Sequence, residues 1–598
     1  MTNRMIHRGP DAESSYYDEN TGVTLGHRRL AIVDLTDTGV QPMTSHNGRY
    51  VIVYNGEIYN SSDIRNKLLS EGIVDSFRGT SDTEVLLEAI VAYGMKIALQ
   101  MTKGMFAIAI YDKQDKTISI SRDRVGEKPL YYGHLNGDFA FASDLDVFRG
   151  YPDWNPEIDP VAVERFLRYS YVPAPMSIYK GIYKLKPGTI RHFEYPYIYS
   201  TEEVYYDLAT EYIDGIHYPF RGSIDEATDA LETTLKEAVK SQLMSDVPLG
   251  AFLSGGIDSS TVVALMQSLG SSPVKTFTIG FNDKKYDESD AAEVIAKHLG
   301  TDHTCLMISE NELKEVVPKM ADIFTEPFAD SSQIPTYLVS KLARTKVTVS
   351  LSGDAGDELF GGYNTYWKTA NLYNKMSRVP EFLKKAAGSV IKNSRSNTLY
   401  RTANCLLSKD IANFHESVCY DMSSLSPKHI EQPMHIGPGD RIEDQMMLRD
   451  MLAYHPDDIL VKVDRAGMAV SLENRVPMLD RDVLKLAFTL PVNYKIGQVN
   501  GQLISKYVLK EVLYRYVPKE IMDRPKKGFS VPLQSWLTTG DIHDWAFSII
   551  EDSHLVRDGI IDKVNLQKIK ESFLSKGINK SLLWNVIVLE QWYRRNYN

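Results

Sequence analysis

The sequence predicts two domains: a mostly stranded α+β domain, then a doubly wound α/β domain with a helical C-terminal extension. The chain has 598 residues, whereas one domain usually holds roughly 100–200. Short β-rich runs dominate the first 190 residues. From about residue 223 strands and helices alternate, which is typical of a parallel sheet. Hydrophobic residues make up 43% and charged residues 24%, a composition that excludes a disordered chain.

The first predicted domain, residues 1–190, is antiparallel where its pattern is clearest. Residues 50–54 are a β-rich run that ends in a turn signal. Residues 105–111 are wholly apolar and residues 117–121 alternate, so the two runs predict a hairpin. We also expect a strand over 139–142 and a helix over 83–93. Residues 191–222 are rich in Tyr and acidic groups, and they predict a linker or a segment packed between domains.

The second predicted domain covers residues 223–598. A helix over 227–243 opens it, because apolar side chains recur there at helical spacing. The elements that follow are strand 249–253, helix 258–269, strand 274–281, helix 287–299 and strand 346–351. This alternation predicts a parallel, doubly wound sheet, and the remainder is mainly helical.

The stretch from Ser254 to Ser260, Ser-Gly-Gly-Ile-Asp-Ser-Ser, has the features of a phosphate-binding loop. Gly255 and Gly256 let the backbone approach a ligand, and the next helix begins with unpaired N–H groups. The hydroxyls of Ser254, Ser259 and Ser260 add donors. The alternative is a glycine turn with an Asp-Ser helix cap, which the whole string in its strand–helix context disfavours.

The same stretch is not a Walker A loop, because the chain contains no Gly-Lys-Ser or Gly-Lys-Thr. This favours chemistry at the α-phosphate with pyrophosphate as the leaving group. Asp258 fits beside a phosphate only if a cation lies between them, and Mg²⁺ is usually held by carboxylates and phosphate oxygens.

A second acidic loop, Ser352-Gly353-Asp354-Ala355-Gly356-Asp357-Glu358, follows another predicted strand. Ligands of parallel sheets bind at the C-terminal strand edges. Asp258 and Asp357 could therefore share one magnesium ion. The alternative, a solvated acidic turn, explains the charges but not the flanking glycines.

Composition limits the partners. A net charge of −11 argues against a broad nucleic-acid surface. No apolar run approaches the roughly 20 residues of a membrane span, and the first residues show no signal peptide. The cysteines Cys305, Cys405 and Cys419 are spaced for neither a zinc site nor a disulfide framework. We expect a cytoplasmic protein that contacts neither nucleic acid nor membrane, with a homodimer as one option for its assembly.

Several motifs resemble those of the glutamine-hydrolysing asparagine synthetases. The motifs in the first half are His7-Arg8-Gly9-Pro10-Asp11, Arg29-Leu30-Ala31-Ile32-Val33-Asp34, Asn55-Gly56-Glu57-Ile58-Tyr59-Asn60 and Ser81-Asp82-Thr83-Glu84. Those in the second half are the two loops, residues 456–465 (Pro-Asp-Asp-Ile-Leu-Val-Lys-Val-Asp-Arg) and residues 471–480 (Ser-Leu-Glu-Asn-Arg-Val-Pro-Met-Leu-Asp). The resemblance implies an N-terminal-nucleophile (Ntn) hydrolase-like glutaminase domain of the class II amidotransferase type, an antiparallel sandwich, joined to an ATP-pyrophosphatase synthetase domain.

The resemblance also implies a reaction and its residues. Aspartate would attack the α-phosphorus of ATP to form an aspartyl adenylate, and ammonia would then displace AMP. Asp354 would support adenylate formation and Lys506 would steady the adenylate. Asp258 and Asp357 would bind Mg²⁺. The implied ATP contacts are Leu253, Ser254, Gly255, Gly256, Asp258, Ser259, Ser260, Ile279, Ser352 and Gly353. Without the resemblance, Lys506 reads as an exposed helix lysine.

A glutamine pocket is implied in the first domain. Arg29 would pair with the α-carboxylate of glutamine, and Leu30, Ala31, Ile32 and Val33 would line the same site. Glu57 and Asp82 would meet the α-ammonium group. Asn55 and the Gly56 N–H would form an oxyanion hole. Taken alone, Asn55-Gly56 is equally a turn.

One departure concerns the nucleophile. The family begins its mature chain with a cysteine in a Cys-Gly-Ile strand, and residues 1–190 contain no cysteine. Either the native enzyme has a cysteine further upstream, so that this domain is truncated at its start, or the protein uses free ammonia. We favour the first interpretation, because the other positions of the implied pocket carry the residue types that the family has there. A smaller departure is Ala355, where relatives often carry glycine.

Two alternatives stay open. Relatives of this type amidate other carboxylates, including sugar acids, by the same adenylation. A non-catalytic glutamine-binding scaffold is the alternative from another class. The most basic cluster, residues 523–529, is either a solvated loop or a loop near the nucleotide phosphates.

Overall fold

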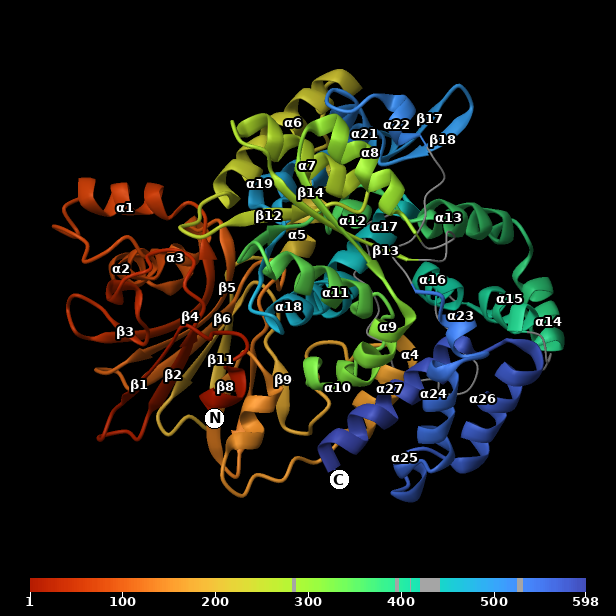
Figure 1. Cartoon of the computed structure of the whole chain (residues 1–598), viewed down its shortest axis with the longest axis horizontal. Coiled ribbons are helices and arrows are strands. Elements are labelled where there is room, and N and C mark those ends of the chain that lie inside the picture. Colours follow the sequence, from red (N-terminus) through yellow and green to blue (C-terminus); the bar gives the residue numbers. More distant parts are fainter. Residues whose placement is uncertain (282–286, 393–396, 409, 420–440, 524–530, 598) are drawn as a thin grey trace.

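The computed structural model describes residues 1–281, 287–392, 397–408, 410–419, 441–523 and 531–597. The basic cluster predicted at residues 523–529 lies outside this range apart from its first residue. Strands of the first part and the mixed sheet-and-helix second part lie side by side (Figure 1). Among the described residues no helix is both long and apolar enough to cross a bilayer.

Six antiparallel strands form the main sheet of the first part. Their order is β11 (Ser200–Val204), β10 (Thr189–Glu194), β6 (Thr117–Arg122), β5 (Gly104–Asp112), β4 (Tyr50–Ile58) and β3 (Met43–Thr44). The predicted hairpin is confirmed, since β5 pairs with β6 from Ala107 opposite Arg122 to Asp112 opposite Thr117. β5 is buried over almost its whole length, as its apolar run predicts.

The two faces of this sheet are covered differently. Helices α1 (Ser61–Ser70), α2 (Asp82–Tyr93) and α3 (Met95–Met101) cover one face. The hairpin β1 (Ala12–Tyr17)–β2 (Thr24–Arg29) and a three-stranded sheet cover the other. That small sheet contains β8 (Asp138–Ala142), β7 (Tyr131–Leu135) and β9 (Ile182–Lys184). Because strand side chains alternate between faces, β4 and β5 supply both layers of this sandwich.

The predicted linker over 191–222 is partly wrong. The boundary at residue 190 falls inside β10, which pairs with β6 and with β11. Only the last part of the segment, α5 (Leu208–His217), leaves the sheet and packs against α19 (Arg481–Thr489). Most side chains of β11 are exposed because it is an edge strand, so the apolar alternation that identifies a strand is missing.

The second part contains a five-stranded parallel sheet. Its order is β14 (Asp302–Ile308), β13 (Lys275–Phe281), β12 (Leu249–Phe252), β15 (Val349–Leu351) and β16 (Glu473–Arg475). Helices α6 (Ile224–Gln242), α7 (Ile257–Leu269) and α8 (Ser289–Leu299) pack on one face. Helices α11 (Gln333–Arg344) and α18 (Leu460–Met468) lie on the other (Figure 1). The predicted doubly wound sheet is therefore confirmed, while β14 and β16 were not predicted.

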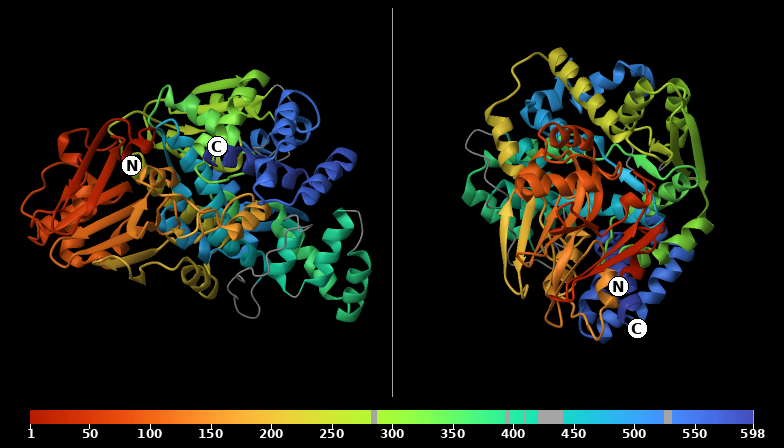
Figure 2. Two further views of the ribbon diagram at one scale, coloured as in Figure 1. Left: turned by 90° about the horizontal axis from the view of Figure 1, so that it is seen from below. Right: turned by 90° about the vertical axis from the view of Figure 1, so that its left-hand side faces the viewer.

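Helices make up most of the rest. They include α12 (Gly356–Phe360), α13 (Asn364–Ser377), α14 (Glu381–Ile391), α15 (Asn397–Leu407), α16 (Ile411–Cys419), α17 (Ile442–Arg449), α21 (Tyr507–Tyr514), α24 (Asp541–Glu551), α26 (Lys563–Lys576) and α27 (Lys580–Tyr597). In a view turned by 90°, α13 to α16 project from the body of the molecule (Figure 2).

Helix α27 returns to the first part of the chain. It packs against α4 (Pro160–Tyr169), where Asn585 Nδ2 donates to the Leu167 carbonyl at 3.0 Å. The Trp592 ring lies 6.0 Å from that of Tyr179. The two parts therefore share one hydrophobic core.

Candidate functional site

The two predicted loops meet at the C-terminal edge of the parallel sheet. They follow β12 and β15, which are neighbours with Ala251 opposite Leu351. The chain adds β13 and β14 on one side of β12, and β15 and β16 on the other. The strand order reverses between β12 and β15, and such reversals are where open α/β sheets bind ligands.

The contact between the loops depends on a glycine. A Cβ atom on Gly353 would lie 2.5 Å from the Ser259 nitrogen and 2.6 Å from the Asp258 carbonyl carbon. Both neighbours are backbone atoms at the start of α7, so neither can turn aside. We therefore expect Gly353→Ala to separate the loops, to cost about 1–3 kcal/mol of stability and to weaken nucleotide binding.

Calorimetric titration with an ATP analogue and urea unfolding would measure both effects. Gly270→Ala is the matched control. Gly270 ends α7, and its added Cβ would meet only ordinary contacts at 3.7 Å. Unchanged nucleotide affinity in Gly353→Ala would contradict the placement of the ligand between the loops.

Hydrogen bonds between serines close the first loop. Ser254 Oγ accepts from the Gly256 N–H at 3.2 Å and lies 3.0 Å from Ser259 Oγ. Gly255 has φ +76°, which favours glycine. Ser260 Oγ and Ser352 Oγ are buried and make no hydrogen bond to any described residue. Such orphaned hydroxyls require an explanation, and a bound phosphate would supply one for Ser352.

Two of the predicted ATP contacts are buried. Leu253 and Ile279 both lie in the hydrophobic core. The Leu253 N–H donates to the Phe277 carbonyl at 3.0 Å, and its carbonyl accepts from Thr278 Oγ1. The side chains of these two residues therefore lie in the core beneath the loop and are not part of its exposed surface.

Lys506 lies between the two predicted metal ligands. Its Nζ is 2.7 Å from Asp357 Oδ1 and donates to Asp258 Oδ2. Burial alone would lower the pKa of Lys506, but the two carboxylates outweigh it and hold that pKa above its ordinary value. The side chain is 6% exposed. Lys506 is therefore not the exposed helix lysine that it resembles in isolation.

The backbone fixes this lysine. Lys506 precedes α21 with φ +55°, and its N–H donates to the Phe360 carbonyl at 3.2 Å. Ala355 also has positive φ, +71°. Left-handed non-glycine residues are uncommon and often occur at functional sites. Ala355 lies in the acidic loop and Lys506 is paired with Asp357 of that loop, so two left-handed non-glycine residues occur where the predicted site residues meet.

The donors around Lys506 fit a magnesium ion bound together with a nucleotide. Asp258 and Asp357 converge on one cation, and Mg²⁺ is usually held by one or two carboxylates plus phosphate oxygens. Among the described residues no group of three or more His, Cys, Asp or Glu side chains forms a metal site by itself. The nucleotide would have to complete the coordination.

Asp354 acts electrostatically on Lys462, a lysine to which the sequence assigned no role. Burial would lower the pKa of Lys462, but Asp330, Asp458 and Asp354 outweigh it and raise that pKa to about 12. Lys462 Nζ donates to Asp330 Oδ2 at 3.1 Å and to Ser332 Oγ at 2.9 Å. Lys462 belongs to the motif at residues 456–465, but only the fold brings it to Asp354.

Acidic groups also lie behind the second loop. Glu358 accepts from the Tyr363 hydroxyl at 2.7 Å and lies 3.6 Å from His455. Asp450 accepts from the Tyr366 hydroxyl at 2.7 Å. Burial raises the pKa of Asp450 to about 7. These groups support α12, which carries Asp357.

Asp450 makes stability depend on pH. Its carboxyl binds a proton more tightly in the folded than in the unfolded chain, so the folded state loses stability as pH rises from about 4 to about 7. We expect Asp450→Asn to remove this loss and to gain at most about 4 kcal/mol at pH 8. Urea unfolding from pH 5 to 8 measures it, with exposed Asp75→Asn as the control. Parallel pH profiles of Asp450→Asn and the parent chain would contradict the assignment.

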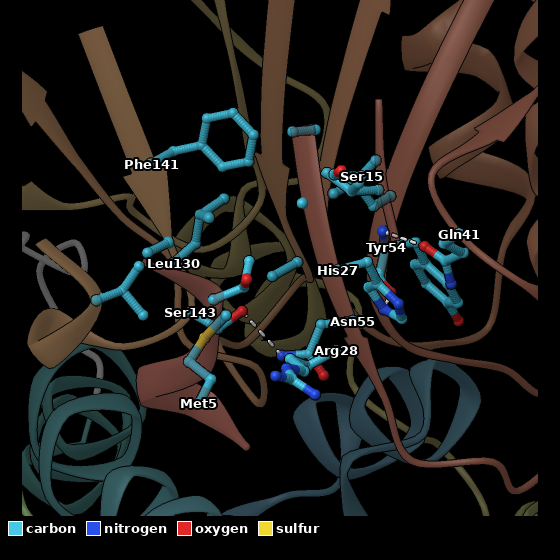
Figure 3. A pocket seen from close by; sticks show the side chains of 18 of the residues that line it. Met5, Ser15, His27, Arg28, Gln41, Tyr54, Asn55, Leu130, Phe141 and Ser143 are labelled. Atoms are coloured by element: carbon cyan, nitrogen blue, oxygen red, sulfur yellow. Dashed lines mark hydrogen bonds between the residues drawn. The ribbon is translucent and has the colours of Figure 1, made fainter. Parts of the chain in front are cut away.

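The predicted glutamine residues line a cavity of about 950 Å³ in the first part. Asn55, Arg28 and Gln41 lie toward one end of it, while Leu130 and Phe141 lie toward the other (Figure 3). Asn55 Nδ2 donates to Ser143 Oγ at 3.2 Å. The cavity thus has a polar end and an apolar end. Of the predicted residues, only Ala31 is absent from its lining.

Arg29 turns its guanidinium toward its own loop. Nη1 donates to the Thr36 carbonyl at 2.9 Å, and Nη2 contacts the carbonyls of Val33 and Asp34. A carboxylate at this arginine would compete with those carbonyls. The predicted ion pair between Arg29 and the α-carboxylate of glutamine therefore requires the guanidinium to reorient.

Glu57 and Asp82 lie buried beside each other at the cavity wall. Asp82 Oδ2 accepts from the Tyr54 hydroxyl and from the Ile58 N–H, each at 2.8 Å. Glu57 Oε2 has no hydrogen-bond partner in the described part of the chain. Burial, and then mutual repulsion, raises the pKa of Glu57, while burial is the main cause that raises the pKa of Asp82. A cation between them, such as an α-ammonium group, would relieve both.

Comparison with known proteins gives the family. The asparagine synthase family profile matches residues 230–594, and the glutamine amidotransferase domain profile matches residues 1–206. Asparagine synthetase [glutamine-hydrolyzing] 1 of Bacillus subtilis is 33% identical over all of this chain and 93% of its own length. This chain belongs to the asparagine synthase family. It is thus of the carbon–nitrogen ligase type, with an amidotransferase domain.

Other relatives differ in their names. A putative asparagine synthetase [glutamine-hydrolyzing] of Mycobacterium tuberculosis is 30% identical over 98% of this chain and 92% of its own length. Amidase chry2 of Gibberella zeae is 25% identical over 93% of this chain and 88% of its own length. Sequence similarity over most of the chain therefore extends to proteins that are not named asparagine synthetase.

The cysteines of this family member lie away from the cavity. Cys305, Cys405 and Cys419 all belong to the second part, and none lines the cavity. Burial raises the pKa of the Cys405 thiol to about 11 and that of Cys419 to about 12. A reactive thiol needs a lowered pKa. None of the three is therefore suited to attack glutamine.

Proposed function

We propose that the chain converts aspartate to asparagine at the expense of ATP, through an aspartyl-AMP intermediate. A β-carboxylate oxygen of aspartate attacks the α-phosphorus, and the bond from that phosphorus to pyrophosphate breaks. Ammonia then attacks the acyl carbon, AMP leaves and the amide nitrogen loses a proton. The observation that supports this reaction best is Lys506 between Asp258 and Asp357, where the two loops meet.

The second part of the chain supplies the groups for the first step. The backbone and hydroxyls of Ser254–Ser260, with Ser352 and Gly353, would hold the phosphates beside the N-terminus of α7. A fixed cation in a dry site stabilises charge that develops at phosphorus, and Lys506 would be that cation. Mg²⁺ on Asp258 and Asp357 would neutralise phosphate charge when it is bound.

Asp354 and Lys462 would handle the acceptor acid. Lys462 already bonds to Asp330, so its ammonium lies where a substrate carboxylate could compete for it. Asp354 acts electrostatically on the same lysine and would contact the α-ammonium group or support adenylate formation. This pairing would supply one cation for a carboxylate of the acceptor and one anion for its α-ammonium group.

The first part would bind glutamine. Arg29 would bind the α-carboxylate of glutamine, and Glu57 and Asp82 would bind its α-ammonium group. Residues 30–33 would line the rest of the pocket. Asn55 and the Gly56 N–H would stabilise the oxyanion. Because the described cavity holds no thiol, free ammonia is the nitrogen source that we propose for residues 1–598 alone.

Pyrophosphate release tests the proposal. The chain is incubated with ATP, Mg²⁺, ammonium and one carboxylate at a time, from aspartate to glutamate and sugar acids. We expect release with aspartate and a matching yield of asparagine, both lost in Asp354→Asn. Release only with another carboxylate would favour the second candidate, a different acceptor, for which the fungal amidase relative is the supporting observation. No release with any acid would favour a non-catalytic scaffold.

A further inference from the structure

One buried arginine contacts both candidate sites. Arg475 lies in β16, is fully buried and donates from Nη1 to the carbonyls of Gln242 and Met244 at 2.8 and 2.6 Å. Nε donates to Glu473 Oε1 at 2.9 Å. Its remaining nitrogen, Nη2, lies 3.6 Å from Glu57 Oε1 in the glutamine cavity. The side chain is thus anchored by three hydrogen bonds, and its remaining nitrogen approaches Glu57, which lines the cavity.

The contact with Glu57 is incomplete. At 3.6 Å it is an ion pair but not a hydrogen bond, and both Arg475 Nη2 and Glu57 Oε2 lack a hydrogen-bond partner among the described residues. Buried polar atoms without partners are costly. A small shift of either group would form the missing bond.

Several charged groups surround this contact. Glu57, Asp82 and Glu473 are all buried within reach of one another, and Arg475 and Lys128 are the cations that act on Glu57. Burial, with the neighbouring carboxylates, raises the pKa of Glu57. An ammonium group beside Glu57 and Asp82 would keep them ionised and strengthen the pull on Nη2.

The backbone of the same residue reaches the nucleotide loop. The Arg475 carbonyl accepts from the Ser352 N–H at 2.9 Å, and Leu351 lies opposite Arg475 in the parallel ladder. Ser352 begins the acidic loop. One residue therefore joins the wall of the first cavity to the backbone of the second site.

We propose that Arg475 is a positioning residue that couples ligand binding in the glutamine cavity to nucleotide binding at the Ser352 loop. A bound α-ammonium group completes the Glu57–Arg475 contact, and this holds β16 and the Ser352 N–H in place. By linkage, the nucleotide must strengthen glutamine binding by the same factor. The inference rests on the proposed glutamine pocket and nucleotide site.

Binding measurements test the coupling without any turnover. Glutamine is titrated calorimetrically with and without α,β-methylene ATP and Mg²⁺. In the parent chain we expect the nucleotide to raise glutamine affinity about tenfold, within the usual range for coupled sites. In Arg475→Lys the ratio should fall to about one, since a lysine cannot make four contacts in fixed directions.

Glu57→Gln changes the other partner of the Glu57–Arg475 contact. It keeps the test decisive if Arg475→Lys does not fold. Glu57→Gln weakens glutamine binding itself. The quantity compared is the ratio of glutamine affinities with and without the nucleotide, and this ratio should also fall to about one. The matched controls are Arg168→Lys and Glu326→Gln. Both change buried ion pairs, with Glu416 and Lys184 respectively, and both should keep the parent ratio.

The outcomes separate the two proposals. If glutamine and nucleotide each bind but the parent ratio is one, or if the ratio survives both Arg475→Lys and Glu57→Gln, the coupling is refuted and the proposed function stands. If glutamine does not bind at all, the proposed pocket fails and the coupling fails with it.

Discussion

Lys506→Met is expected to lower aspartate-dependent pyrophosphate release about a thousandfold, the upper end of the range for losing one charge-stabilising group. Lys506 is buried between Asp258 and Asp357 and is the cation that the described part of the chain places against both. Methionine keeps the length and apolar stem of lysine. The loss should therefore appear in kcat, with smaller changes in the KM for ATP.

Stability distinguishes a chemical from a structural effect. Breaking a fully buried ion pair costs roughly 3–5 kcal/mol, but the Asp258 and Asp357 side chains remain 19% and 20% exposed. We expect a smaller loss, measured by urea unfolding. Exposed Lys519→Met is the control and should match the parent chain in both assays. A folded Lys506→Met enzyme with near-normal release would refute the assigned role.

Ammonium is expected to support amide formation by residues 1–598, and glutamine is expected to fail by more than about a hundredfold under the same conditions. Thiol chemistry needs an activated thiolate, and no cysteine lines the cavity in this structure. Asparagine formed from ¹⁵N-ammonium or from glutamine labelled in its amide measures the two sources separately.

Serine variants of the three cysteines control this experiment. Cys305→Ser, Cys405→Ser and Cys419→Ser should leave ammonium-dependent synthesis unchanged. Glutamine-dependent synthesis by the parent chain would contradict the prediction. If it also persisted in the triple variant, a nucleophile other than these thiols would have to be sought in the cavity.

The sequence predicts regular elements well where the local pattern carries the information. The apolar run at 105–111 and the alternation at 117–121 identified β5 and β6. The order of apolar and polar side chains along a strand reflects which of its faces are buried. The two glycine-containing loops were placed at one sheet edge because parallel strands share direction. Family membership is confirmed by the comparisons.

The missed features depend on partners far along the chain. β16 is three residues long and becomes a strand only by pairing with β15, more than a hundred residues earlier. Tertiary packing alone brings Lys462 to Asp330 and Arg475 to Glu57. The side-chain direction of Arg29 was also beyond the sequence, since its carbonyl partners belong to a local turn whose geometry the residue types leave open.

The return of α27 to α4 has a consequence for engineering. Arg149 Nη2 donates to the Asn596 carbonyl at 2.6 Å, and Asn585 binds the Leu167 carbonyl, so residues near 150–170 and 585–596 fold against one another. A gene cut after residue 206 would yield a first fragment with the apolar side of α4 uncovered. Each fragment alone would tend to aggregate. A split version of this enzyme should be produced by expressing both pieces in the same cell, so that each covers the other as it folds.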